Sequence, residues 1–190
     1  MSRPDPVRVA ALVGNPRPGS RTLAAAAALA RTLAVRLDPA ATAAGPASVV
    51  DLATLAPTLH AQPRTPDLDA ALQAVADADV LVVATPVHKA SFTGLLKSFL
   101  DLYGPDGLAG VVAVPLVVSA SAAHALVGEV HLRPVLVELA ATVPTRSLTL
   151  LDAELADVAP AVERWWQRAE HPLRRAVGAD RPARTLEVAR

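Results

Sequence analysis

The chain has 190 residues, 52% of them hydrophobic but only 3% aromatic, so its apolar content is mostly Ala, Val and Leu. Its 18 Lys and Arg residues balance 18 Asp and Glu residues, which gives no support to nucleic-acid or anionic-membrane binding. The absence of cysteine excludes disulfides, thiolate nucleophiles and Cys-ligated zinc or iron–sulfur sites. This composition is typical of one α/β domain whose parallel strands are buried on both faces.

The N-terminal sequence MSRPDPVRV has no apolar core long enough for a signal peptide. No run reaches the roughly 18 uninterrupted apolar residues that a membrane-spanning helix needs. We therefore expect a soluble, cytoplasmic protein.

Apolar and helical patterns alternate along the chain. Buried strands are predicted at Val7–Val13, Ala47–Leu52, Val80–Ala84, Val111–Val118 and Thr145–Leu151. Helices are predicted at Thr22–Arg36, Asp67–Asp79 (with Asp67 as N-cap), Thr93–Tyr103, Ala125–Ala141 and Val158–Ala176, the last an amphipathic helix with Trp165 and Trp166. Asp38–Pro46 is a predicted connector, Ala53–Pro66 a predicted irregular segment, and Gly178–Arg190 a predicted mobile tail after a single domain over residues 1–177.

Two prolines interrupt these patterns. Pro115 lies within a predicted strand and cannot donate to a ladder, so we expect it at a bulge or at an unpaired N–H. Pro134 lies within a predicted helix and should kink or divide it near Leu132–Arg133.

Alternating strands and helices predict a three-layer α/β sandwich with right-handed crossovers. Five strands suit a flavodoxin-like parallel sheet in the order 2-1-3-4-5, in which a ligand binds where the loops after strands 1 and 3 meet. The loops after strands 1, 3 and 4 would be Gly14–Thr22, Thr85–Phe92 and Ser119–His124. They are also the chemically richest loops of the chain.

The first of these loops, GNPRPGSRT, connects a buried strand to a helix N-terminus, which is a common way to hold a phosphate. A nucleoside-triphosphate P-loop would need Lys and then Ser or Thr where Ser20 and Arg21 stand, and a dinucleotide fingerprint would need Gly where Pro16 stands. A compact monophosphate remains, against the alternative of an ordinary polar turn.

The second loop lies in ATPVHKASFTGLLKSFLD, where Pro86 fixes φ and offers a rigid backbone wall for a flat aromatic ligand. An ordinary proline turn before a core helix is the alternative.

Together, GNPRPGSRT, ATPVHKASFTGLLKSFLDLYG and SASAAHALVGEVHLRPVLVEL resemble the NAD(P)H-dependent FMN reductase family, most closely the branch that serves two-component sulfonate monooxygenases. The resemblance covers about Val7 to Leu139. It implies that the first loop binds the FMN phosphate, the second lines the isoalloxazine, and the third brings backbone close to the ring. The implied cofactor-binding residues are Asn15, Arg17, Ser20, Arg21, Thr22, Thr85, Pro86, Val87, His88, Lys89, Ser119, Ala120 and Ser121. The family commonly has serine where Asn15 stands and tyrosine where His88 stands.

The resemblance implies hydride transfer from NADPH or NADH to FMN, with reduced FMN leaving for a partner monooxygenase. Stacked cofactors carry that chemistry, so no catalytic side chain is required. An FMN-retaining quinone or azo-compound reductase, and a flavodoxin-like electron-transfer module, are the alternatives. His124 and His131 lack a third ligand and make a poor metal site, and none is predicted.

A homodimer or homotetramer is also expected, because Thr93–Tyr103 carries more apolar residues than one sheet contact requires. By resemblance, Lys97 and Asp101 serve a subunit interface, and a one-residue helix bulge falls near Val130–His131, with His131 at an interface.

Overall fold

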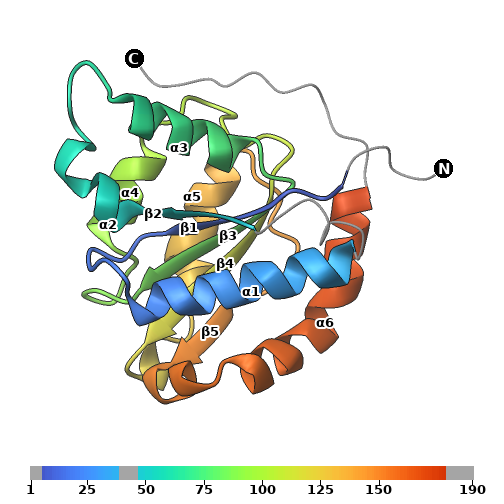
Figure 1. Cartoon of the computed structure of the whole chain (residues 1–190). Coiled ribbons are helices and arrows are strands. Elements are labelled where there is room, and N and C mark those ends of the chain that lie inside the picture. Colours follow the sequence, from blue (N-terminus) through green and yellow to red (C-terminus); the bar gives the residue numbers. More distant parts are fainter. Residues whose placement is uncertain (1–5, 39–46, 179–190) are drawn as a thin grey trace.

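The computed structural model describes residues 6–38 and 47–178, which form one five-stranded parallel sheet flanked by helices (Figure 1). The strand order is β2-β1-β3-β4-β5, as predicted. The strands are β1 (Val9–Val13), β2 (Ser48–Asp51), β3 (Val80–Pro86), β4 (Val112–Ser119) and β5 (Leu148–Leu151). Every pair is parallel, so the carboxyl ends of all five strands lie at one edge, at the left in Figure 1.

Helices cover both faces of the sheet, which confirms the three-layer arrangement (Figure 1). One face packs against α1 (Arg21–Leu37) and α6 (Ala159–Gly178). The other face packs against α3 (Pro66–Ala76), α4 (Gly94–Leu100) and α5 (Arg133–Glu138), with the single turn α2 (Leu52–Leu55) beside them. No helix among the described residues combines the length and the apolar character needed to cross a membrane.

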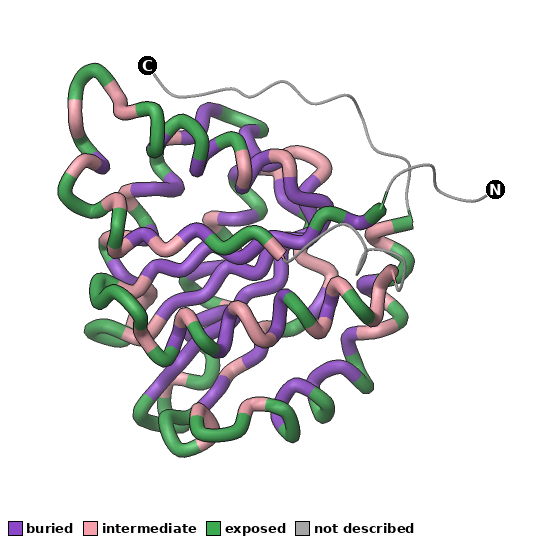
Figure 2. The backbone as a smooth tube through the Cα atoms, in the orientation of Figure 1, coloured by how far each residue is buried: buried purple, intermediate pink, exposed green. Residues whose placement is uncertain are grey.

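The central strands are buried along nearly their whole length, as the purple centre of Figure 2 shows. Successive side chains of a strand point to opposite faces, so β1 sends Ala11 and Val13 to one core and Ala10 and Leu12 to the other. A strand covered on both faces must be apolar at every position, which explains the continuous VLVVA run in β3.

Small side chains let α1 lie close to the sheet. Ala25, Ala26 and Ala30 are buried against it, together with Leu29 and Leu33. On the same face, α6 buries Trp165 and Trp166 as predicted, and the Trp165 indole N–H donates to the Arg146 carbonyl at 2.8 Å.

Three local predictions were wrong. Asp67 is not an N-cap: α3 starts at Pro66, and the Thr65 hydroxyl accepts the Leu68 N–H, because proline suits the first helical position. Residues 53–66 are not wholly irregular, since α2 and a 3₁₀ helix at Ala56–Thr58 occupy their first part. The fourth predicted helix does not begin at Ala125, because a 3₁₀ turn (Ala122–His124) precedes it and regular helix begins later. Apart from Asp38 and Gly178, the predicted connector Asp38–Pro46 and the predicted tail Gly178–Arg190 lie outside the described residues.

Pro115 lies in regular β4 opposite Val83, without a bulge. Ala113 lies two residues before Pro115, so the backbone N–H positions of both residues point to the same side of the strand, away from β3. The Ala113 N–H donates to the Thr142 carbonyl, and pairing with β5 starts only at Leu116. Pro115 therefore falls in the gap between these contacts, where a missing N–H breaks no ladder bond. The unpaired alternative is correct.

A π-helix at Gly128–Leu132 precedes α5, which confirms the bulge expected near Val130–His131. The change to α-helix falls at Arg133, with Pro134 at the start of α5, so Pro134 divides this helix where predicted. A proline there removes one backbone donor from the helix at the point where its winding changes.

Candidate functional site

A cavity of about 420 Å³ opens at the carboxyl edge of the sheet, where the loops after β1 and β3 lie side by side (Figure 1). The Gly14 N–H donates to the Ala84 carbonyl at 2.8 Å and holds the starts of the two loops together. The cavity is lined by Asn15, Arg17, Pro18, Gly19, Ser20, Arg21, Thr22, Pro86, His88, Val118, Asp152 and Leu155. All five predicted residues of the first loop are among them.

Internal hydrogen bonds shape the first loop. The Asn15 side chain donates to the Thr22 hydroxyl at 3.1 Å and accepts the Arg17 N–H at 3.0 Å. Ser20 caps α1 by accepting the Leu23 N–H at 3.1 Å, and Gly19 supplies the left-handed φ of 63° that the turn requires. The N-terminus of a 17-residue helix, two hydroxyls and two guanidinium groups thus face one cavity, which suits a phosphate.

The second loop is tied to the first through Thr93, the N-cap of α4. Its buried hydroxyl donates to the Gly14 carbonyl and accepts the Leu96 N–H, and its own N–H donates to the Thr85 hydroxyl at 3.2 Å. A Cβ on Gly14 would lie 2.5 Å from the Leu96 Cβ, so only glycine permits this close docking. The positions of the two cavity-forming loops are therefore coupled.

Of the five second-loop residues predicted to bind cofactor, only Pro86 and His88 line the cavity. Thr85 is fully buried and donates its hydroxyl hydrogen to the Pro86 carbonyl, so it stabilises the loop from inside the protein. Val87 donates its N–H to the Val118 carbonyl at 2.8 Å. Lys89 lies at the exposed tip, where Lys89 and Ala90 have φ of 50° and 60° in a tight turn closed by His88 and Ser91.

The third predicted loop lies beside the cavity but does not line it. Ser119 is buried, and its hydroxyl accepts the Ser121 N–H at 3.1 Å and lies 3.3 Å from His124 Nδ1. Ser121 caps the following turn by accepting the Ala123 N–H, and Ala120 is exposed. None of Ser119, Ala120 and Ser121 is among the cavity-lining residues.

Five cavity residues were not predicted: Pro18, Gly19, Val118, Asp152 and Leu155. The first two belong to the predicted loop, and Val118 ends a predicted strand. Asp152 and Leu155 lie in the 3₁₀ helix Asp152–Ala156 that follows β5. Arg21 approaches Asp152 at 3.4 Å across the cavity. A carboxylate following the last strand was the one signal available in the sequence.

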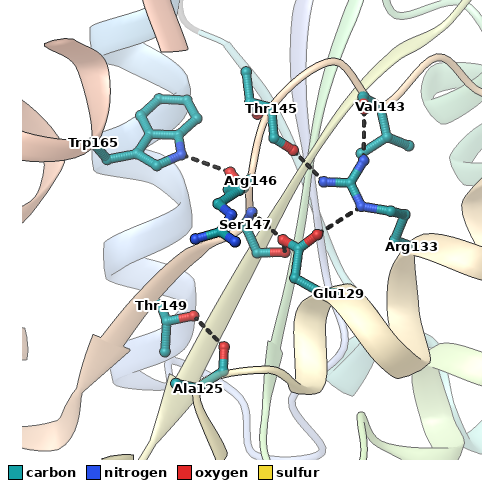
Figure 3. A network of polar contacts seen from close by, with 9 residues as sticks. All are labelled: Ala125, Glu129, Arg133, Val143, Thr145, Arg146, Ser147, Thr149 and Trp165. Atoms are coloured by element: carbon teal, nitrogen blue, oxygen red, sulfur yellow. Dashed lines mark hydrogen bonds and ion pairs between the residues drawn. The ribbon is translucent and has the colours of Figure 1, made fainter. Parts of the chain in front are cut away.

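A second polar cluster joins the π-helix to the segment before β5 (Figure 3). Glu129 accepts the backbone N–H and the hydroxyl of Ser147, at 2.7 and 2.8 Å, and the Arg133 Nε–H at 2.8 Å. Arg133 also donates to the carbonyls of Val143 and Thr145. Partial burial by itself raises the pKa of Glu129, but the bonds from Arg133 and Ser147 and the Arg133 charge outweigh it and lower that pKa.

Acid–base chemistry has little support among the groups with shifted pKa. Burial raises the pKa of the Tyr103 hydroxyl, which donates to the Leu72 carbonyl at 2.9 Å within the helix layer. Within residues 6–38 and 47–178, no group of three or more His, Cys, Asp or Glu side chains could hold a metal ion. The cavity, lined by two arginines and by Pro86, is suited to binding an anionic ligand beside a rigid wall.

The sheet order and the ligand-sized cavity at the ends of β1 and β3 define a flavodoxin-like α/β protein. The chain belongs to the NADPH-dependent FMN reductase family, whose model matches residues 7–154.

Individual relatives agree with that assignment. FMN reductase (NADPH) of Pseudomonas putida is 40% identical over 98 residues, which is 52% of this chain and 50% of that protein, so the match spans about half the relative's length. NADH-dependent FMN reductase SfnE of Pseudomonas putida is 34% identical over 80% of this chain and 81% of its own length. Among solved structures, the apo form of the NADH:FMN oxidoreductase EMOB has a TM-score of 0.75 and 29% identity, covering 92% of this chain and 91% of that one.

Proposed function

We propose that this protein is an NAD(P)H-dependent FMN reductase that transfers hydride from NADPH or NADH to FMN and supplies reduced FMN to a flavin-dependent monooxygenase. One observation carries the proposal: the phosphate-type loop and the Pro86 wall line the same cavity. Relatives named FMN reductase (NADPH) and NADH-dependent FMN reductase support the reaction class.

The residues present fit FMN. The N–H groups at the start of α1, the hydroxyl of Ser20 and the guanidinium of Arg17 would hold the phosphate. Pro86, Val118 and Leu155 offer apolar surface for the flat ring. Bound FMN would supply the hydride-accepting atom, and these residues would orient it in the cavity.

His88 stands where tyrosine is usual in the family, and it lines the cavity from the second loop. An imidazole there would contact the flavin by stacking or hydrogen bonding. We also retain backbone contacts from Ser119, Ala120 and Ser121 as part of the proposed site, because β4 ends next to β3 and its last residues lie beside Pro86.

The assembly we propose is a homodimer or homotetramer, but the apolar residues of α4 and its flanks are a weaker reason for it than expected. Leu96, Phe99, Leu100 and Tyr103 are buried in the chain's own core. Of the large exposed apolar side chains, the three most exposed, Leu126, Val130 and Val137, lie around the π-helix and α5. A cytoplasmic location follows from the proposed use of NADPH or NADH.

The deciding experiment is NADPH and NADH oxidation by the purified protein with added FMN, FAD or riboflavin. We expect FMN to stimulate oxidation strongly and to exchange freely. Absence of stimulation by any flavin would overturn the proposal. A yellow protein that keeps FMN through purification and shows ping-pong kinetics with a quinone or azo compound would instead identify an FMN-retaining reductase. Flavin binding without coenzyme oxidation would identify an electron-transfer module.

A further inference from the structure

A carboxylate shares the cavity with the phosphate-type loop. Asp152 and Leu155 reach it from the 3₁₀ helix Asp152–Ala156, which follows β5 at the same edge of the sheet. The Asp152 carboxylate lies 3.4 Å from a terminal guanidinium nitrogen of Arg21, the first residue of α1. An anionic side chain is unexpected here, because a helix N-terminus and two guanidinium groups otherwise favour a negatively charged ligand.

The ion pair contributes little to the fold. The side chains of Arg21 and Asp152 are 67% and 47% exposed, and solvent screens exposed pairs strongly. The contact is also a single nitrogen–oxygen approach rather than a bidentate pair, so it does not hold the guanidinium in one orientation. The main consequence of Asp152 is therefore the charge that it brings into the cavity.

The two arginines of the loop differ in this respect. Arg21 faces Asp152, whereas the Arg17 guanidinium makes no ion pair with any residue in the described part of the chain. A phosphate entering the cavity meets Arg17 directly. To reach Arg21 it must displace the carboxylate or bind beside it, and in both cases it gains less than the guanidinium alone would give.

We propose that Asp152 competes with the phosphate of the flavin for Arg21 and so weakens its retention, which makes FMN an exchangeable substrate rather than a fixed prosthetic group. This inference rests on the proposed function. Asp152 is thus a residue that sets how long the phosphorylated ligand stays bound. Its effect is specific to the phosphate, because riboflavin has the same ring and ribityl chain but no charge to repel.

The test compares wild-type protein with Asp152→Asn, which keeps the side-chain shape and removes the charge. FMN and riboflavin dissociation constants are measured by quenching of flavin fluorescence, and FMN release is followed by stopped flow. We expect Asp152→Asn to bind FMN about three- to tenfold more tightly, mainly through slower release, with the gain shrinking in high salt. Riboflavin affinity should change less than about twofold, because no phosphate charge is involved.

Glu170→Gln is the matched control. Glu170 forms an exposed ion pair with Arg174, with side chains 46% and 47% exposed, and its substitution changes the net charge equally. Arg174 also donates to the Arg36 carbonyl near the C-terminal end of α1, at the opposite end of that helix from the cavity. We expect Glu170→Gln to leave both dissociation constants unchanged.

Unchanged or weaker FMN binding by Asp152→Asn would overturn the inference, as would an equal gain for riboflavin or the same gain in Glu170→Gln. Urea denaturation of both variants shows whether they are folded. Failure of the proposed function would give a different result. No flavin would then stimulate NADPH or NADH oxidation by the wild-type protein, whatever the ratio of the FMN dissociation constants of wild type and Asp152→Asn.

Discussion

Two arginine-containing clusters of this protein use their charges in opposite ways. Arg133 donates to Glu129 and to the carbonyls of Val143 and Thr145, so each of its three guanidinium nitrogens bonds to a fixed acceptor (Figure 3). In the first loop, Arg17 contacts the protein through its backbone N–H, and Arg21 has one exposed ion pair. A guanidinium that is hydrogen-bonded within the protein stabilises the fold, whereas one without such bonds beside a cavity can bind a ligand.

Replacing Arg133 should have the largest effect on stability. Arg133→Leu leaves two carbonyls and the Oε2 atom of Glu129 without this donor, so we expect the free energy of unfolding to fall by about 3 kcal/mol. Urea denaturation measures the loss. Arg164→Leu, which breaks one exposed ion pair with Glu154, should cost less than about 0.5 kcal/mol. Equal losses would mean that the Arg133 cluster has no special structural role.

The same cluster predicts a pH dependence. Because the pKa of Glu129 is lowered in the folded protein, its contribution to stability is present above the ordinary carboxyl value of 4.5 and is lost as pH falls through the lowered value. At neutral pH, Glu129→Gln should be less stable than wild type by about 1–2 kcal/mol. The difference should shrink in urea titrations at successively lower pH. A difference that stays constant down to pH 3 would contradict the assignment.

Replacing an arginine of the first loop should change ligand binding instead of stability. We expect Arg17→Gln to raise the KM for FMN about tenfold through loss of one charge-assisted hydrogen bond, with the free energy of unfolding unchanged. Riboflavin, which has no phosphate, should show no such change. Arg31→Gln, an exposed arginine further along α1, is the control. A loss of stability without a change in KM would mean that Arg17, like Arg133, stabilises the fold and does not bind the phosphate.

Backbone strain is expected at the tip of the second loop, as it is at Asp106 and Ala140, which also have positive φ. Ala90 has a φ of 60° at the tip of the second loop, a conformation that costs an L-residue energy and glycine little. Ala90→Gly should raise the free energy of unfolding by about 0.5–1 kcal/mol. Ala74→Gly in the helix α3 should lower it by about 1 kcal/mol. If thermal denaturation shows both variants destabilised, the turn is not strained.

The smallest effect is expected at the exposed pair of Lys97 and Asp101. These side chains bond to each other along α4, so Asp101→Asn should cost about 0.2–0.5 kcal/mol. Light scattering on the same variant tests the expected interface role, because an interface pair would also weaken the assembly. An unchanged mass with a small stability loss would make the pair an ordinary helix contact.

Much of this architecture follows from local patterns. Runs such as VLVVA favour burial on both faces, and five strands alternating with helices suit the sheet order 2-1-3-4-5 that the structure has. Signals for some boundaries were present but misjudged: Thr65 followed by Pro66 marks a helix start as clearly as Asp67 does. Thr85 was expected to contact the ligand because it belongs to a predicted ligand-binding loop, yet its side chain points into the protein. Loop membership predicts where a residue lies, but not which way it faces.

Asp152 illustrates the other limit. Its surroundings, LDAELAD, read as an ordinary polar turn after a strand. Only the pairing of β5 with β4 and the docking of α1 on the sheet bring this turn to Arg21. The chain alone specified the element order, the two buried faces and a phosphate-type loop, because these depend on side-chain polarity and backbone preference over a few residues. The folded structure decided that the Arg133 side chain bonds to fixed acceptors, that Arg17 makes no ion pair among the described residues, and that Arg21 faces a carboxylate. The contacts of Arg133 and Arg21 join segments that meet only after the helices pack.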